Sequence, residues 1–275
     1  MPELPEAETI ARDLEGAVRG ATVATVLVHR VDILRECDAA SFVARVEGTT
    51  IDGFGRRAKS IVATLSSADR VVVTPRFTGA LLVASGTTPD ADSRYTAIEI
   101  RLVDGRVLRY RDVRRLGTVA LMSAARFGEW SATIGPEPLD QELTAGRFSG
   151  IVRASRRAIK TILMDQQRVA GIGNIYANEA LWHAGIRPTR VGTRVSAAES
   201  SRLLDALRAV LTASIVLRGT SFRDYRDAFG GRGSYVDRLE AYGRGGLPCS
   251  RCGTTLKSHH RLGGRATVYC PRCQR

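Results

Sequence analysis

Hydrophobic positions repeat with two different periods along this chain. Near the N-terminus apolar residues recur every three to four positions, at Ala7, Ile10, Ala11, Leu14, Ala17 and Val18. This spacing predicts a helix over residues 2–19, ended by Gly20. From residue 22 to 122 short apolar and alternating runs predict strands, with a hairpin turn at Asp104-Gly105. The predicted strands are 22–29, 59–65, 70–74, 80–84, 95–102, 107–111 and 117–122. So many short strands predict a β-sandwich.

Helical periodicity returns after residues 132–150, where Pro136 and Pro138 interrupt the pattern. Helices are expected near 139–148, 155–166, 174–184 and 196–217, the last opened by a Ser196–Glu199 capping box. The Gly- and Arg-rich stretch 218–236 predicts a mobile loop. The expected class is α+β and multidomain, an N-terminal helix with a β-sandwich followed by a helical domain and a small C-terminal module. The boundaries we expect are 1–131, a linker with the first helix at 132–150, 151–236 and 237–275.

Four of the five cysteines form two C-x2-C pairs separated by seventeen residues, namely Cys249, Cys252, Cys270 and Cys273. This spacing is typical of a zinc finger with four thiolate ligands, in which one Zn²⁺ is structural because no coordination position stays open. Gly263-Gly264 predicts the turn of a hairpin between the pairs. Disulfides are one alternative, and they suit a cytoplasmic chain poorly. A redox C-x2-C pair is the other, and no thioredoxin-like βαβ pattern surrounds either pair. His259 and His260 are either extra ligands or contacts to solvent or phosphate.

Charge points to a polyanionic partner. The chain of 275 residues has 41 Lys and Arg against 28 Asp and Glu, a net charge of +13, and its last segment from Arg244 carries seven basic residues and no acid. Such a field favours nucleic acid, although a genome that favours Arg is an alternative source of part of the bias. No apolar run approaches eighteen residues, which excludes a membrane span. The acidic start MPELPEAETI is unlike a secretory signal, so we expect a cytoplasmic protein.

Two further segments carry candidate chemistry. Removal of Met1 would leave Pro2 as a secondary amine able to attack an aldehydic carbon, beside Glu3 and Glu6 as candidate acid–base groups. The alternative is an ordinary helix start containing Pro and Glu. Gly171, Gly173 and Asn174 precede a periodic helix, and this turn could hold a phosphate on free backbone N–H groups. Its alternative is an ordinary packing corner between helices.

Six segments together resemble the formamidopyrimidine-DNA glycosylase/endonuclease VIII family. They are MPELPEAET at the start, GRRAK at 55–59, RDVRRLG at 111–117, VAGIGNIYANEALWHAGIRP at 169–188, YGRGGLPC at 242–249 and GRATVYCPRCQ at 264–274. They run in order over nearly the whole chain. The resemblance implies an N-terminal helix on a β-sandwich, a helix–two-turn–helix domain and a zinc finger, with double-stranded damaged DNA between the domains. It also implies excision of oxidised bases, followed by cleavage of the abasic strand by elimination.

The resemblance assigns roles to individual residues. Pro2 matches the nucleophile that attacks C1′, Glu3 the acid that assists sugar-ring opening, and Glu6 a supporting carboxylate. Lys59 matches a lysine that contacts phosphate near the lesion. The remaining matches are DNA contacts: Asn174 and Arg265 at the phosphates around the flipped nucleotide, Lys160 on a helix near the DNA, Arg114 in an Arg-x-Phe turn, and Tyr242 in YGRGGLPC.

In this family, side chains fill the gap that the extruded nucleotide leaves in the duplex. The sequence departs from the family pattern at these positions. Phe77 stands where Met is expected, Leu116 where Phe is expected, and Thr74 where a histidine often contacts phosphate. Leu4 and the long 218–236 segment favour the formamidopyrimidine-type branch. The segment resembles the family's lesion-capping loop, which covers an extruded oxidised purine, so oxidised purines such as 8-oxoguanine are the expected substrates. A glycosylase of the same fold for oxidised pyrimidines or bulky adducts, and a non-catalytic protein that binds damaged DNA, are the alternatives. We expect a monomer.

Overall fold

The computed structural model describes residues 2–86 and 93–275 and divides into two compact units. The first unit comprises Met1–Ala132 and Leu217–Ser234, and the second Thr133–Val216 and Tyr235–Arg275. Residues 217–234, which the sequence placed with the helical domain, therefore belong to the unit that contains the N-terminus. Met1, whose removal we expect, lies outside the described residues. None of the described helices is long and apolar enough to cross a membrane.

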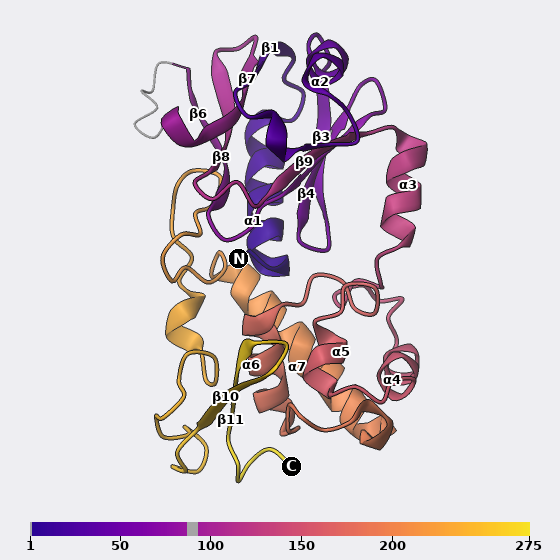
Figure 1. The fold of residues 1–275 in the computed structure, drawn as a ribbon, viewed down its shortest axis with the longest axis vertical. Helices are drawn as coiled ribbons and strands as arrows, with labels where there is room; N and C mark the ends of the chain where they lie inside the picture. The colour runs from indigo at the N-terminus through magenta and orange to yellow at the C-terminus, as the bar shows by residue number, and fades with distance from the viewer. Residues whose placement is uncertain (1, 87–92) are drawn as a thin grey trace. The chain divides into compact units, whose positions relative to one another are not determined.

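The first unit is the predicted β-sandwich (Figure 1). One antiparallel sheet has the order β1-β7-β8-β6, and the other has the order β2-β9-β5-β4-β3 with β2 parallel to β9. The strands are β1 (Val23–Val28), β2 (Leu34–Arg35), β3 (Ile51–Arg57), β4 (Ser60–Leu65), β5 (Arg70–Thr74), β6 (Gly79–Ser85), β7 (Thr96–Leu102), β8 (Arg106–Asp112) and β9 (Thr118–Met122). The helical segments are α1 (Leu4–Val18), η1 (Val31–Ile33), α2 (Ala39–Val46), η2 (Ser93–Tyr95) and α3 (Ala124–Ala132).

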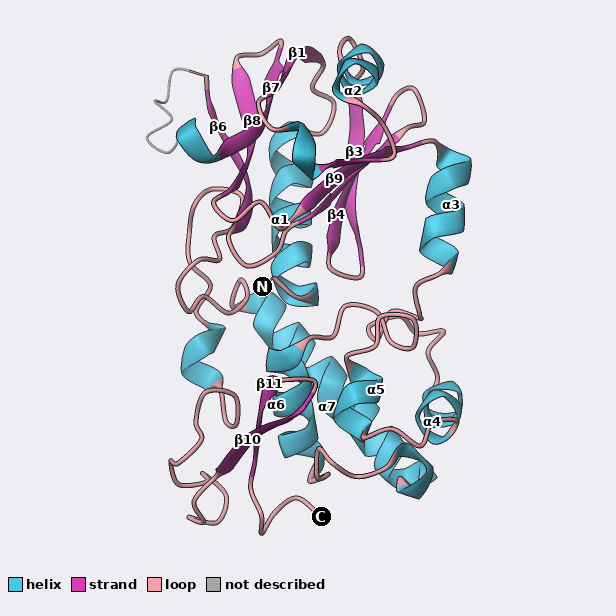
Figure 2. Ribbon diagram, viewed as in Figure 1, coloured by secondary structure: helices cyan, strands magenta, loops and turns pink. Residues whose placement is uncertain are grey.

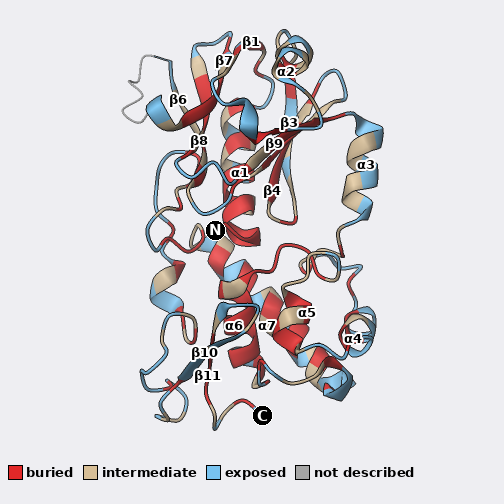
Figure 3. Ribbon diagram, viewed as in Figure 1, coloured by how far each residue is buried: buried red, intermediate tan, exposed pale blue. Residues whose placement is uncertain are grey.

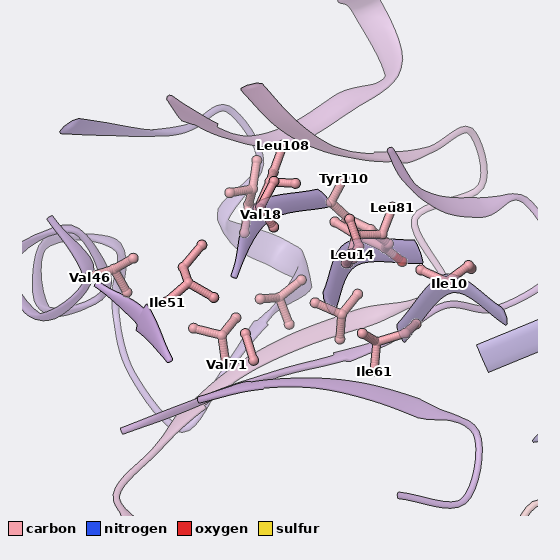
Figure 4. Packing of buried hydrophobic residues seen from close by; sticks show 14 of the residues in the cluster. Ile10, Leu14, Val18, Val46, Ile51, Ile61, Val71, Leu81, Leu108 and Tyr110 are labelled. Carbon is pink, nitrogen blue, oxygen red and sulfur yellow. The ribbon is translucent and has the colours of Figure 1, made fainter. Parts of the chain in front are cut away.

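Helix α1 contributes to the same core as both sheets. Its apolar residues Ile10, Leu14 and Val18 are buried among strand residues such as Ile61 and Leu108 (Figure 4). The predicted helix is thus confirmed, and Gly20 follows it at φ +79. Much of α1 is buried (Figure 3), so the helix is a rigid support for its own start, where the candidate residues Pro2, Glu3 and Glu6 lie.

Several elements of the first unit were not predicted from the sequence. Strand β3 contains two glycines and three charged residues, so its apolar alternation is broken. Helix α2 has only eight residues and is capped by the Asp38 side chain, which accepts from the Ser41 N–H at 2.7 Å. Helix α3 has only nine residues and none of them is fully buried, and its apolar face is short, with Phe127 and Trp130 packed against the sheet, so it gives little periodicity to detect.

The second unit is mainly helical (Figure 2). Its elements are α4 (Ala145–Arg153), α5 (Ile159–Leu163), α6 (Asn174–Ala184), η3 (Gly192–Arg194), α7 (Ala197–Val216), η4 (Tyr235–Arg238), β10 (Lys257–Leu262) and β11 (Arg265–Tyr269). Helix α6 has the predicted bounds. The Ser196–Glu199 box at α7 is confirmed by two bonds, Ser196 N–H to Glu199 Oε2 at 2.8 Å and Glu199 N–H to Ser196 Oγ at 3.2 Å.

Two predicted helices of this unit were wrong in extent. The helix expected at 139–148 begins only at Ala145, because the Thr144 hydroxyl caps it by accepting from the Arg147 N–H. The helix expected at 155–166 is limited to Ile159–Leu163. There the Gln166 side chain donates to the Met164 and Ile172 carbonyls and accepts from the Gly171 N–H, so it stabilises a turn in place of further helix.

Candidate active site and DNA-binding residues

The start of α1 carries a reciprocal capping box between the two candidate acids. The Glu3 N–H donates to Glu6 Oε2 at 2.8 Å, and the Glu3 carboxylate accepts from the Glu6 backbone N–H. Both side chains are buried, at 3% and 1% exposure. Pro2 is buried directly before them. The box therefore fixes the backbone beside the candidate nucleophile.

The second oxygen of Glu6 holds the loop that follows α7. The Thr220 N–H donates to Glu6 Oε1 at 2.8 Å. Gly219 approaches so closely that a Cβ there would lie 3.0 Å from the Glu6 Oε1 atom, and its φ of +85 also favours glycine. Arg218 anchors the same loop, with its guanidinium 2.6 Å from Asp13 on α1 and 2.6 Å from Asp227. These partners show that the base of the predicted mobile loop is attached to α1.

Lys59 lies at the tip of the β3–β4 hairpin. Arg57 pairs with Ser60, so Ala58 and Lys59 form the two-residue turn, with Ala58 at φ +53. Arg56, next along the strand, forms an ion pair with Glu8 of α1 at 2.8 Å. The arginines Arg56 and Arg12 hold the pKa of Glu8 below its ordinary value, although burial opposes this. The ion pair attaches the hairpin that carries Lys59 to the first turns of α1. Thr74 bonds to Ser60 at 2.7 Å, within this hairpin's own sheet.

The candidate wedge residues occupy two adjacent turns of the first unit. Phe77 lies between β5 and β6 and is 42% exposed, and Leu116 lies between β8 and β9 and is 40% exposed. The Arg114 guanidinium is 5.0 Å from the centre of the Phe77 ring, within range of a cation–π contact. The structure therefore groups Phe77, Arg114 and Leu116 on two neighbouring turns, with apolar side chains exposed to solvent.

In the second unit, Asn174 is the first residue of α6, after Gly173 as the N-cap and Gly171 at φ +77. Its backbone carbonyl accepts from the Asn178 side chain at 2.6 Å. Asn178 also joins α6 to the C-terminal hairpin, because its Oδ1 accepts from the Val268 N–H at 2.9 Å. The turn that carries Asn174 is thereby attached to strand β11, which begins at Arg265.

Lys160 is buried, with 1% of its surface exposed. Its Nζ donates to the Ala266 carbonyl at 2.7 Å and to Thr267 Oγ1 at 2.9 Å. A contact between Lys160 and DNA stays a prediction, and its observed partners are those of a residue that supports the hairpin. Arg265 next to this contact is exposed, and Gly263 and Gly264 form the predicted turn at φ +60 and +68.

The four cysteines converge as the spacing predicts. Their Sγ atoms all lie within 4.8 Å of one another, which suits a tetrahedral S₄ zinc site with Zn–S bonds of about 2.3 Å. Among the described residues, neither histidine of the finger joins this cluster; the His259 Nδ1 instead accepts from the Arg261 N–H. Two of the ligands, Cys249 and Cys270, pack in a small core with Trp182 of α6. The finger therefore packs against α6.

Glu179 of α6 is a functional candidate that the sequence analysis missed. It is fully buried, and its carboxylate accepts from the N–H groups of Glu240, Ala241 and Tyr242 at 2.8, 2.9 and 2.7 Å. Burial raises its pKa, and the three N–H donors oppose that shift. Glu179 thus sets the path of the chain into the finger and fixes the backbone of Tyr242. An acid within the apolar segment IYANEALW was the available signal.

An N-terminal helix on a β-sandwich, a helical unit and a finger with four clustered cysteines form the arrangement expected of a DNA glycosylase with a zinc finger. The formamidopyrimidine-DNA glycosylase N-terminal domain matches residues 1–119, its helix–two-turn–helix domain matches 134–226, and the zinc finger found in these enzymes and in isoleucyl-tRNA synthetase matches 246–275. The chain belongs to the formamidopyrimidine-DNA glycosylase family.

Relatives and solved structures match over the full length. A formamidopyrimidine-DNA glycosylase of Thermomicrobium roseum is 43% identical, covering 100% of this chain and 99% of the relative, and one of Heliobacterium modesticaldum is 38% identical with 100% of both covered. A Lactococcus lactis FPG mutant bound to a Fapy-dG containing DNA has a TM-score of 0.91 at 31% identity, with 100% of both chains covered. The Thermus thermophilus MutM (FPG) protein has a TM-score of 0.87 at 34% identity, with 99% of this chain and 98% of that one covered.

Proposed function

We propose that this protein is a bifunctional DNA glycosylase and abasic-site lyase that removes oxidised purines from duplex DNA, with Pro2 as its nucleophile. The observation that carries the proposal is the arrangement at the start of α1, where Pro2 directly precedes the buried Glu3–Glu6 capping box. The solved complexes of Lactococcus lactis FPG with Fapy-dG DNA and with abasic-site DNA support the substrate class. Excision requires the nucleotide to leave the base stack, because C1′ is inaccessible within a duplex.

The reaction uses the first unit. After removal of Met1, the Pro2 amine attacks C1′, the base departs, and Glu3 donates a proton as the sugar ring opens. An iminium then links Pro2 to C1′ and acidifies the C2′ protons, so the 3′ phosphate leaves by β-elimination and the 5′ phosphate by a second elimination. Glu6 acts through Glu3 and the Thr220 loop. Lys59 serves as a point charge for a phosphate, since a hydrated ammonium beside phosphates stays protonated.

The second unit binds the DNA backbone. Asn174 at the start of α6 and exposed Arg265 on β11 contact phosphates of the extruded nucleotide, and Tyr242 adds a contact near the finger. Lys160 supports these contacts by holding β11 through its bonds to Ala266 and Thr267. The four clustered thiolates would hold one structural zinc ion, which would take no part in the reaction because four protein ligands leave no coordination position open.

Phe77, Arg114 and Leu116 fill the gap left by the extruded nucleotide. Two exposed apolar side chains and one cation on adjacent turns suit stacking against bases and pairing with the orphaned partner base. The enzyme acts as a monomer in the cytoplasm, where its net charge of +13 draws it to DNA.

A panel of duplexes tests this function. Each duplex carries one oxidised purine, one oxidised pyrimidine or a preformed abasic site, and strand cleavage is followed under single-turnover conditions. We expect excision of 8-oxoguanine and formamidopyrimidines together with nicking of the abasic site. Excision of pyrimidines alone would reassign the substrate, and binding without any cleavage would identify a non-catalytic damage-binding protein.

A further inference from the structure

Asp112, at the end of β8, joins the two turns that carry the candidate wedge residues. Its Oδ1 accepts from the Thr78 hydroxyl at 2.6 Å and from the Arg114 N–H at 3.2 Å. Its Oδ2 accepts from the Gly117 N–H at 2.7 Å and from the Tyr110 hydroxyl at 3.4 Å. The carboxylate therefore binds one residue of the β5–β6 turn, Thr78, and two residues of the β8–β9 turn, Arg114 and Gly117.

The surroundings leave this carboxylate little freedom. Asp112 is 1% exposed, and its cross-strand partner is Gly79, which ends the turn containing Phe77. A Cβ at Gly117 would lie 1.9 Å from the Tyr110 hydroxyl oxygen and one at Gly79 would lie 2.8 Å from it. Both turns thus pack tightly around the Tyr110–Asp112 pair. Strain is also present, because Phe77 has φ +37 and Arg115 has φ +52, and such backbone needs fixed neighbours to persist.

We propose that Asp112 is a positioning residue that couples the two turns, so that Phe77, Arg114 and Leu116 enter the DNA as one preformed wedge. The inference rests on the proposed function for its biological meaning. The coupling itself does not depend on catalysis. The two turns are already ordered before DNA binds, so the entropy lost in ordering them is not subtracted from the free energy of DNA binding. Thr78 assists, since its hydroxyl donates to Asp112 and accepts from the Arg114 N–H at 3.1 Å.

The substitution Asp112→Asn tests the coupling with almost no change of shape. Each carboxylate oxygen accepts a backbone N–H, from Arg114 or from Gly117, so in either orientation the new amide group would face an N–H donor. Asp104→Asn is the matched control, because Asp104 lies in the exposed turn of the neighbouring β7–β8 hairpin. Thr78→Val is a second, milder variant for use if Asp112→Asn folds poorly.

The main readout is the fluorescence of 2-aminopurine placed beside a stable abasic analogue in duplex DNA, which reports insertion of the wedge without any reaction. We expect Asp112→Asn to lose most of the fluorescence change at saturating protein, Thr78→Val to lose part of it, and Asp104→Asn to match the unmodified protein. An unchanged signal in Asp112→Asn and Thr78→Val would overturn the proposal.

Single-turnover cleavage provides the second readout. We expect Asp112→Asn to slow excision from intact duplex roughly tenfold, the effect of one buried donor left unpaired, while nicking of a preformed abasic site changes less than about threefold. Equal losses on both substrates would overturn the positioning role. If the unmodified protein cleaves nothing but its fluorescence signal depends on Asp112, the proposed enzyme function fails and the coupling stands.

Discussion

Glu6 and Thr220 lie 214 residues apart in the chain, yet the Thr220 N–H donates to Glu6 Oε1 at 2.8 Å. The other oxygen of Glu6 accepts the Glu3 N–H at the same distance. A single buried carboxylate therefore connects the helix start that carries Pro2 with the loop after α7.

Glu6→Gln should destabilise the first unit and slow excision. A glutamine has only one acceptor oxygen, so either the Glu3 or the Thr220 N–H would face an amide group, at a cost of about 1–3 kcal/mol. Chemical unfolding of the variant should show this decrease. Glu129→Gln is the control, since the Glu129 side chain is 72% exposed, and equal stability of the two variants would contradict the role of Glu6.

Cys252→Ser should lose zinc and DNA affinity together. Three thiolates hold the ion less well than four, and the folding of the small finger depends on its metal. Elemental analysis should find one zinc per chain in the unmodified protein and less in the variant. Cys37→Ser is the matched control because Cys37 is the cysteine outside the cluster. A zinc-depleted finger with unchanged DNA binding would refute this account.

Lys160→Met should weaken DNA binding through Arg265. The variant keeps an unbranched apolar side chain of similar size and removes the donors to Ala266 and Thr267, so strand β11 loses part of its support. If Lys160 acts only by positioning Arg265, the losses in affinity of Lys160→Met and Arg265→Ala should fail to add in the double variant. Additive losses would instead favour a separate contact with DNA. Lys257→Met, at an exposed position of β10, should leave affinity within about threefold, since one phosphate contact at most is lost.

Local patterns in the sequence predicted the elements with strong periodicity or turn signals. Helix α6, the Gly263-Gly264 hairpin and the four-cysteine cluster follow directly from spacing. Helix α3 was missed because its apolar face consists mainly of Phe127 and Trp130, and strand β3 because glycines and charged residues break its alternation. The truncation of α5 depends on the side chain of Gln166, whose partners no periodicity reveals.

The site residues divide in the same way. Pro2, Glu3 and Glu6 are adjacent in sequence, so their proximity was predictable, whereas the partners of Glu6, Asp112 and Glu179 come from distant segments or from turn backbone. Such carboxylates accept hydrogen bonds from backbone N–H groups. The residue type does not reveal which backbone N–H groups will donate, so the sequence does not predict these partners. Burial of Lys160 was likewise not apparent, because Lys is almost never fully buried unless it is paired.

Phe77→Ala should reduce excision from intact duplex more than nicking at a preformed abasic site. Stacking of an aromatic ring against bases contributes about 1–3 kcal/mol, and less unstacking is needed where the base is already missing. Comparison of single-turnover rates on the two substrates measures the difference. Val103→Ala, which removes another exposed apolar side chain of the first unit, in the turn between β7 and β8, serves as a control for general loss of apolar surface. Equal losses on both substrates would assign Phe77 to a structural role.

The identity of the nucleophile is the central claim, and borohydride trapping tests it most directly. Reduction during turnover on an abasic or 8-oxoguanine duplex should convert the iminium into a stable protein–DNA adduct, and peptide mapping should place that adduct on Pro2. Protein that retains Met1 has the same side chains at all later positions but no free amine at Pro2, and we expect it to trap no DNA. Trapping by the form that retains Met1, or an adduct mapped to Lys59, would contradict the account.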